Sequence, residues 1–245
     1  MLKLFRVLIA LLMVLVVGLS AVQAQDTVTL GEVIEGEMTA DEYEFEYQFE
    51  AEAGEVIAAL FTDPEQTGNL VSPILILTNP AGDVIADTSD AFTFGDLTLF
   101  AEINSSGTYT LTVTRMDEED GTDEGVFNLE IISVPVIGTG EVIEDSVSTE
   151  GGVALYAVRP DSEWAVSYVR GAGDMEVELT VNRIDSSIGT LEELALVEGE
   201  GVTEVVLGLF EEDETYIVRV GEPLFAFTFD EEEVEYTLEV LTFED

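Results

Sequence analysis

The side chains with the clearest capacity for chemistry in this sequence are carboxylates. The chain of 245 residues has 53 Asp and Glu against 7 Lys and Arg, and it has no His and no Cys. A Ser/His/Asp triad, a Cys/His nucleophile and an ordinary zinc site all need imidazole or thiolate groups, so these chemistries are excluded. The net charge of −46 would repel a phosphate backbone, which argues against nucleic-acid binding.

The densest group of carboxylates lies at residues 117–124, between two segments of alternating pattern. Calcium prefers six to eight oxygen ligands, and an acidic loop that contains glycine can fold several carboxylates around one ion. The spacing does not match an EF-hand loop, because Gly121 falls at its fifth position and no Glu stands at its twelfth. We therefore predict a solvated loop, no metal site and no cofactor, with calcium at Asp117, Asp120 and Asp123 as the weaker alternative.

No other motif indicates catalysis. A glycosidase needs two facing acids in a cleft, which sequence spacing in a sheet protein cannot show. The Asp-Thr-Gly signature of an aspartic protease is absent, and Asp87-Thr88-Ser89 is its nearest approach. We predict a protein that is not an enzyme, with no catalytic and no cofactor-binding residues. The single tryptophan, Trp164, is expected in core or edge packing, with sugar stacking as the alternative, while Arg159 and Arg170 are expected to pair with acids.

The first 24 residues form a separate unit. Lys3 and Arg6 precede an almost unbroken apolar run at 8–17, and small residues stand at Val22 and Ala24. This pattern predicts a secretory signal peptide, with an uncleaved anchor as the alternative. All 53 acidic residues follow Ala24, so the remaining chain has five arginines, no lysine and a net charge of −48. We expect a secreted or extracellular protein.

The rest of the chain contains an internal repeat. Gly-Glu-Val-Ile-Glu at 31–35 recurs at 140–144, and an offset of 109 also relates Tyr47 to Tyr156. The same offset relates 127–131 to 236–240, and an offset of 107 relates Thr108-Tyr109 to Thr215-Tyr216. Matches at the start, middle and end of the repeat predict two homologous domains, at 26–134 and 135–245.

Within each copy the apolar residues recur with a period of two. Tyr43, Phe45, Tyr47 and Phe49 alternate with polar residues, and the segment after Thr108 does the same. This period is typical of strands with one buried face, and no segment after residue 24 has a helical period. Turn residues such as those at 79–82 separate the runs. The expected fold is all-β, with two tandem β-sandwich domains of jelly-roll type.

These motifs resemble a known family. The elements that carry the resemblance are Asp41-x-Tyr43-x-Phe45, Ala53-Gly54-Glu55-x-Ile57, Pro73-x-Leu75-x-Leu77, Gly82 and Ser106-Gly107-Thr108-Tyr109-x-Leu111-x-Val113. Together they are similar to the bacterial pre-peptidase C-terminal domain, a small extracellular β-sandwich that is commonly appended to secreted peptidases. The resemblance covers residues 30–133, whereas the second copy is divergent, with Glu214 in place of Gly107 and no Pro-x-Gly turn after Val181.

The resemblance implies a secreted, non-catalytic binding, adhesion or spacer protein. Its expected partner is an extracellular protein or polysaccharide, with no nucleic acid and no membrane after cleavage of the signal peptide. Two alternatives remain open. One is an accessory or inhibitory subunit of a secreted peptidase, and the other is a carbohydrate-binding module.

Overall fold

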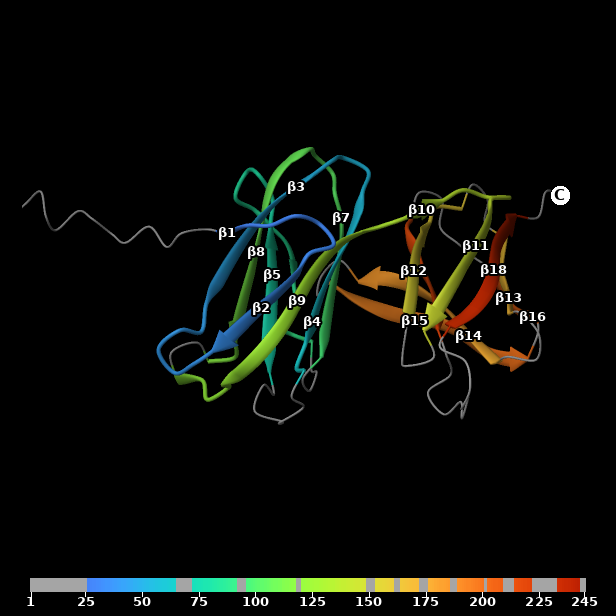
Figure 1. Cartoon of the computed structure of the whole chain (residues 1–245). Helices are drawn as coiled ribbons and strands as arrows, with labels where there is room; N and C mark the ends of the chain where they lie inside the picture. The colour runs from blue at the N-terminus through green and yellow to red at the C-terminus, as the bar shows by residue number, and fades with distance from the viewer. Residues whose placement is uncertain are drawn as a thin grey trace, which may run out of the picture.

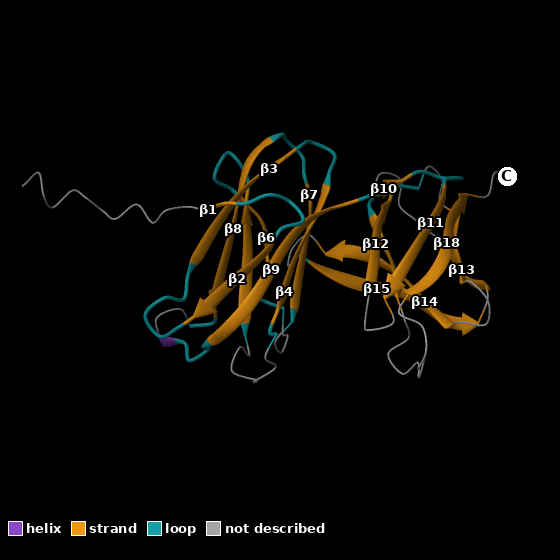
Figure 2. Cartoon of the chain, in the orientation of Figure 1, coloured by secondary structure: helices purple, strands orange, loops and turns teal. Residues whose placement is uncertain are grey.

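The computed structural model describes residues 26–64, 72–91, 96–117, 120–148, 153–160, 164–171, 176–185, 189–200, 202–208, 214–221 and 233–242. The described chain is all-β and forms two β-sandwiches, as the alternating pattern predicts (Figures 1 and 2). No helix in these ranges has the length and apolar composition needed to cross a membrane. The predicted signal peptide lies outside the described residues.

The first sandwich contains nine strands. They are β1 (Asp26–Thr27), β2 (Val33–Met38), β3 (Phe45–Ala51), β4 (Val56–Thr62), β5 (Pro73–Thr78), β6 (Val84–Asp87), β7 (Leu97–Glu102), β8 (Gly107–Arg115) and β9 (Gly125–Val134). One sheet has the order β1-β3-β8-β5-β6, and the facing sheet has the order β2-β9-β4-β7. All strand pairs are antiparallel except β1 with β3.

The second sandwich also shows nine strands in the described residues. They are β10 (Val136–Ile137), β11 (Val142–Ser148), β12 (Val153–Val158), β13 (Trp164–Gly171), β14 (Glu176–Asp185), β15 (Thr190–Glu200), β16 (Val202–Gly208), β17 (Tyr216–Gly221) and β18 (Glu233–Thr242). Its sheets have the orders β10-β12-β17-β14-β15 and β11-β18-β13-β16. Each strand therefore occupies the place of the strand nine earlier in the chain.

The register of pairing repeats as well as the strand order. In the first sandwich Val33 pairs with Glu130, and in the second Val142 pairs with Glu239, so both partners are displaced by 109 residues. The parallel pair also repeats, with a displacement of 110 residues, since Asp26 opposes Tyr47 and Val136 opposes Ala157. The sequence repeat thus corresponds to a repeat of backbone pairing. The numerical domain boundaries remain a prediction.

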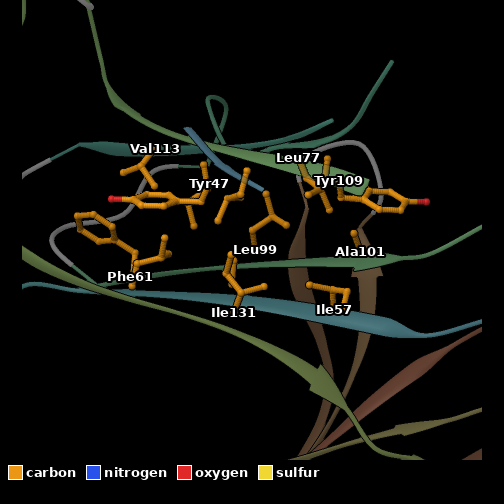
Figure 3. Close-up of a cluster of buried hydrophobic side chains, with 14 of the residues drawn as sticks. Tyr47, Ile57, Phe61, Leu77, Leu99, Ala101, Tyr109, Val113 and Ile131 are labelled. Carbon is orange, nitrogen blue, oxygen red and sulfur yellow. The ribbon is translucent and has the colours of Figure 1, made fainter. Parts of the chain in front are cut away.

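Alternation along the strands builds the core of each sandwich. On β8 the side chains of Tyr109, Leu111 and Val113 are buried between the sheets, where they meet Ile57 and Ile131 from the facing sheet (Figure 3). Tyr156 and Tyr216 are buried in the second core. The four tyrosines matched by the repeat therefore all point inward. Aromatic residues are among the largest fully buried side chains of the first core. Burial of apolar surface is the dominant favourable term in folding.

Tyr109 also closes a turn by hydrogen bonding. Its hydroxyl donates to the carbonyl of Ser105, four residues earlier, at 2.7 Å. Gly107 lies between them with a φ of 151°, and a Cβ there would come within 2.8 Å of Pro80. The Pro80 turn and the glycine therefore depend on each other. The second copy lacks both, so its two departures from the pattern of the first copy correspond to a single structural change.

The second core contains a polar network where the first has an aromatic ring. The Tyr156 hydroxyl donates to Oδ2 of Asp145 at 2.7 Å and lies 2.7 Å from the Tyr236 hydroxyl. Since a carboxylate only accepts, Tyr236 donates to Tyr156. At the matching positions the first sandwich has Phe127, whose ring fills the space beside Gly36. The Tyr236 hydroxyl and the Asp145 carboxylate therefore occur together in the second copy, and both are absent from the first, which has Phe127 and Gly36.

Because the phenol groups of Tyr47, Tyr156 and Tyr236 are buried, we expect the protein to lose stability at alkaline pH. Burial is the main cause that raises the pKa of Tyr47 to about 12, with a further increase from Asp26 and Glu42. Burial likewise raises the pKa of Tyr156 to about 12, and the pKa of Tyr236 is raised in the same direction. The unfolded value is 10.0, so this stabilisation is complete below pH 10 and is lost as the pH rises through about 12.

For Tyr47 and Tyr156, the rise in pKa from 10.0 to about 12 corresponds to a loss of up to about 3 kcal/mol each, at about 1.4 kcal/mol per pKa unit. The urea concentration at the unfolding midpoint should be measured between pH 8 and pH 12, with tyrosinate absorbance followed in parallel. Above pH 10 the midpoint should fall as the tyrosinate absorbance rises. Tyr47→Phe should make the fall shallower. A midpoint that is constant up to pH 12 would contradict the prediction.

The two sandwiches are joined by a third apolar cluster. Its buried members are Val56, Ala58, Phe100 and Val134 from the first unit and Ala157 and Ile217 from the second. On β4, Ile57 and Ala59 face the first core, whereas Val56 and Ala58 face the second sandwich. The Phe100 amide also donates to the carbonyl of Gly189 at 2.6 Å. The two units are therefore in direct contact through both side chains and backbone.

Candidate functional site

The predicted acidic loop connects β8 to β9, and its described part is held by backbone contacts. The Asp120 amide donates to the carbonyl of Asp117 at 2.9 Å, and Asp117 has a left-handed φ of 62°. Oδ2 of Asp123 accepts from the Ser72 amide at 2.6 Å. Residues 118 and 119 lie outside the described residues. The three predicted carboxylates thus have different environments, and Asp123 is used to anchor a neighbouring segment.

Arg115, the last residue of β8, organises this loop from inside. Its side chain is only 1% exposed. Nη1 donates to the carbonyls of Asp123 at 2.8 Å and of Thr39 at 3.2 Å, while the guanidinium lies 4.8 Å from the ring centre of Tyr43. A Cβ at Gly121 would come within 2.8 Å of Nε. The Arg115 guanidinium therefore supplies a positive charge to the acidic loop and links the loop to the β2–β3 connection through hydrogen bonds.

The calcium alternative at Asp117, Asp120 and Asp123 finds little geometric support. Among the described residues, no group of three or more acids lies close enough together to hold a metal ion. Of the three predicted ligands, Asp123 is already used, since its Oδ2 accepts from the Ser72 amide and its carbonyl accepts from Arg115.

A depression lies beside the loop, on the outer face of the β1-β3-β8-β5-β6 sheet. Its volume is about 620 Å³. It is lined by Tyr43, Ile74, Ile76, Ser89, Thr114, Arg115, Asp117 and Asp120. Ile74 and Thr114 are direct partners on β5 and β8, and both point away from the core. The lining therefore combines the apolar side chains of Ile74 and Ile76 with two acidic residues and one arginine.

The other residues considered from the sequence have structural roles where they are described. The Thr88 hydroxyl is buried and accepts from the Leu75 amide at 2.9 Å, so the segment at 87–89 closes a sheet edge. The backbone of Trp164 begins β13, but its side chain and that of Arg170 lie outside the described residues. Sugar stacking by Trp164 therefore stays a hypothesis.

Arg159 joins the two sandwiches. Its Nη2 donates to the carbonyl of Gly54 at 3.0 Å and lies 3.8 Å from Oε1 of Glu102, both in the first unit. Its Nε donates to the Thr215 hydroxyl of the second unit at 2.9 Å. The expected pairing of Arg159 with an acid is confirmed. The contact reaches across the boundary between sandwiches.

A second cavity, of about 240 Å³, lies between the sandwiches. Its lining residues are Ile85, Phe100, Ala101, Glu102, Asn104, Arg183, Ile184, Glu214 and Thr215. Arg183 pairs with Glu192 on the neighbouring strand, and that carboxylate raises the pKa of Arg183 further. The cavity is lined by charges of both signs, as is the depression beside the acidic loop.

The contact between the sandwiches was missed from the sequence. A signal for it exists at Val56–Phe61, where apolar residues run without alternation. A strand that is apolar on both faces is covered on both faces. Ile217, between the inward residues Tyr216 and Val218, gives the same signal in the second copy.

No protein-family model and no curated protein matches the chain. Among solved structures, the fold is similar to the pre-peptidase C-terminal domain of a collagenase from Bacillus anthracis. The identity is 16%, the coverage is 44% of this chain and 93% of that chain, and the TM-score is 0.33. This is the family that the sequence motifs resemble.

Two further similar structures cover both sandwiches. One is a putative secreted protein from Eubacterium rectale, with 12% identity, coverage of 86% of this chain and 74% of that chain, and a TM-score of 0.30. The other is the tandem CBM22-1–CBM22-2 domain of Xyn10C from Paenibacillus barcinonensis, with 8% identity, coverage of 85% and 82%, and a TM-score of 0.29. These likenesses concern the fold alone.

Proposed function

We propose that this protein is exported and acts outside the cell as a non-catalytic binding module for a positively charged partner. The observation that carries the proposal is the use made of the arginines. Arg115 is buried, Arg159 bridges the sandwiches, Arg183 pairs with Glu192, and Arg219 pairs with Glu178 at 2.6 Å. Each arginine whose side chain is described is engaged within the molecule, so its charge is already partly offset, whereas the acidic residues far outnumber the arginines.

Such a surface supports binding in two ways. A strongly negative field attracts and orients a cationic partner before contact, which increases the association rate more than the final affinity. The apolar cluster between the sandwiches holds both acidic surfaces in a fixed arrangement, so little ordering cost arises when a partner binds. The pattern of residues 1–24 supports export.

Two measurements test this proposal. Mass spectrometry of the extracellular fraction of producing cells should find Gln25 at the N-terminus, and a retained Met1 there would contradict cleavage. Cross-linking in the same culture, followed by reconstitution with the purified partner, should give an association rate that falls steeply as sodium chloride increases. A rate independent of salt would refute binding through charge.

The same reconstitution separates the alternatives. If the purified partner is a peptidase whose turnover changes on binding, the protein is an accessory or inhibitory subunit. If a glycan array shows saturable binding that salt does not weaken, the protein is a carbohydrate-binding module. Either result would replace the proposed function.

A further inference from the structure

We propose that the tip of the β14–β15 hairpin closes an open side of the first sandwich and thereby holds the two copies together as one rigid unit. This inference goes beyond the proposed function, since it concerns how the two copies are joined rather than what they bind. Three features carry it: the lengths of the strands, their pairing register and the contacts of Gly189, which directly precedes β15.

The hairpin is longer in the second copy than in the first. β14 and β15 have 10 and 11 residues, whereas β5 and β6, which occupy the matching places in the first copy, have 6 and 4. In the first copy the strand ends at Thr78, and the chain turns where the Gly82 amide donates to the carbonyl of Asn79 at 2.9 Å. In the second copy the strand continues to Asp185, and the hairpin reaches the first sandwich (Figure 1).

The pairing register shows which residues the longer strand adds. Val181 occupies the place of Leu77, since their partners on β17 and β8 each lie two residues after the matched tyrosine. Ile184, three residues further along the chain, therefore stands where the first copy has Pro80. Ile184 pairs with Leu191 on β15, and both side chains pack against the apolar cluster between the sandwiches. The second copy thus has an apolar contact residue in place of the proline turn.

Gly189 brings the hairpin against the core of the first sandwich. It has a left-handed φ of 64°, and its amide donates to the carbonyl of Asp185 at 2.8 Å, which closes the turn. A Cβ at this position would lie 3.0 Å from Cβ of Ala86 and 3.2 Å from Cγ of Leu99. Both of these residues are buried members of the first core. The backbone conformation and the closeness of the first sandwich therefore both favour glycine here.

The hairpin tip lies where the two sheets of the first sandwich end. Ala86 is on β6 and Leu99 is on β7, and these strands are the last of the two facing sheets. An edge strand presents N–H groups that have no partner in its own sheet. The Phe100 amide on β7 donates instead to the Gly189 carbonyl of the second copy, at 2.6 Å. Removal of the hairpin would expose apolar surface along this edge, which lowers the local stability of β6 and β7.

Native-state hydrogen exchange of the full chain, followed by NMR, tests the contact at the Phe100 amide. Gly189→Ala should accelerate exchange at Phe100 by at least about tenfold, because the added methyl group pushes the hairpin away from β7. Gly140→Ala is the matched control, since Gly140 has a similar φ of 77° but a Cβ there would meet no atom within 4 Å. The control should change exchange at Phe100 by less than about twofold. Equal acceleration in the two variants would overturn the contact.

Residual dipolar couplings test the rigidity, because they report the orientation of each sandwich separately. One alignment tensor should fit the amide couplings of both sandwiches in the unsubstituted protein. Gly189→Ala combined with Leu191→Ser should require two different tensors, because the hairpin no longer holds the first sandwich. The control combines Gly140→Ala with Leu196→Ser, a leucine on the same strand that is 46% exposed, and should keep one tensor. Two tensors in the unsubstituted protein would refute the rigid unit.

A double substitution tests whether the hairpin tip lies against β6. Ala86→Gly and Gly189→Ala should each lower the melting temperature when made alone. Together they should melt at least about 2 °C above the value expected from adding the two losses, because removal of the Ala86 methyl group leaves room for the new one. Strictly additive losses would show that the two positions do not touch, and would contradict the placement of the tip at this edge.

Discussion

Arg115→Met should lower the free energy of unfolding by about 3–5 kcal/mol, because at least two carbonyls lose a charged donor, at a cost of about 1–3 kcal/mol each. Methionine keeps most of the volume of the side chain but cannot donate hydrogen bonds. The carbonyls of Thr39 and Asp123 would then lose their donor inside the protein. The acids at 117–124 would also lose the positive charge nearest to them.

Urea unfolding measures this loss, and hydrogen exchange at 120–125 should show that the loop opens before the rest of the sandwich. Arg115→Lys should recover only part of the stability, because an ammonium group cannot reproduce the forked donors of a guanidinium. Arg183→Met is the matched control, since it breaks an exposed pair with Glu192 and should cost under about 1 kcal/mol. Equal effects of the two methionine variants would refute the role given to Arg115.

Tyr109→Ala should destabilise the protein by roughly 3–5 kcal/mol, the cost typical of deleting a large buried side chain. Tyr109 is 1% exposed, stacks on Phe49 at a centroid distance of 6.0 Å, and contributes the hydrogen bond to Ser105. Truncation therefore removes buried area, an aromatic contact and the closure of the turn before β8 together.

Tyr109→Phe separates these contributions. It keeps the ring and removes only the hydroxyl, so a loss of about 1 kcal/mol is expected. Both variants should be compared by urea unfolding with Thr108→Ala, an exposed position on the same strand, which should change stability by less than about 0.5 kcal/mol. A small loss in Tyr109→Ala would mean that the ring does not carry the packing inferred from its burial.

The repeat and the fold class could be predicted from residue order because they depend on local pattern. The period of two at Tyr43 to Phe49 assigns alternate side chains to opposite faces of a strand, and this assignment needs no knowledge of the partner strand. The divergence of the second copy was also visible, at Glu214 and after Val181. Its cause was not visible, because Pro80 and Gly107 meet only when β5 and β8 pair.

The role of the acidic loop could not be predicted from the sequence pattern. Its composition indicated either solvation or calcium, since acidic residues in sequence do not reveal which oxygens remain free. Arg115 is the last residue of the alternating strand β8. Its inward direction follows from the alternation with Val113, but its hydrogen bonds to Thr39 and Asp123 join segments that are remote in sequence.

By itself, the sequence determined the excluded chemistries, the all-β class and the two-copy organisation, since these follow from residue types, strand period and self-similarity. Tertiary structure alone decided that Val56 and Ala58 join the sandwiches, that Arg159 crosses between them, and that Arg115 reaches the carbonyls of Thr39 and Asp123. The physical reason is that burial and hydrogen-bond satisfaction depend on which surfaces meet, whereas periodicity determines only which face each side chain occupies.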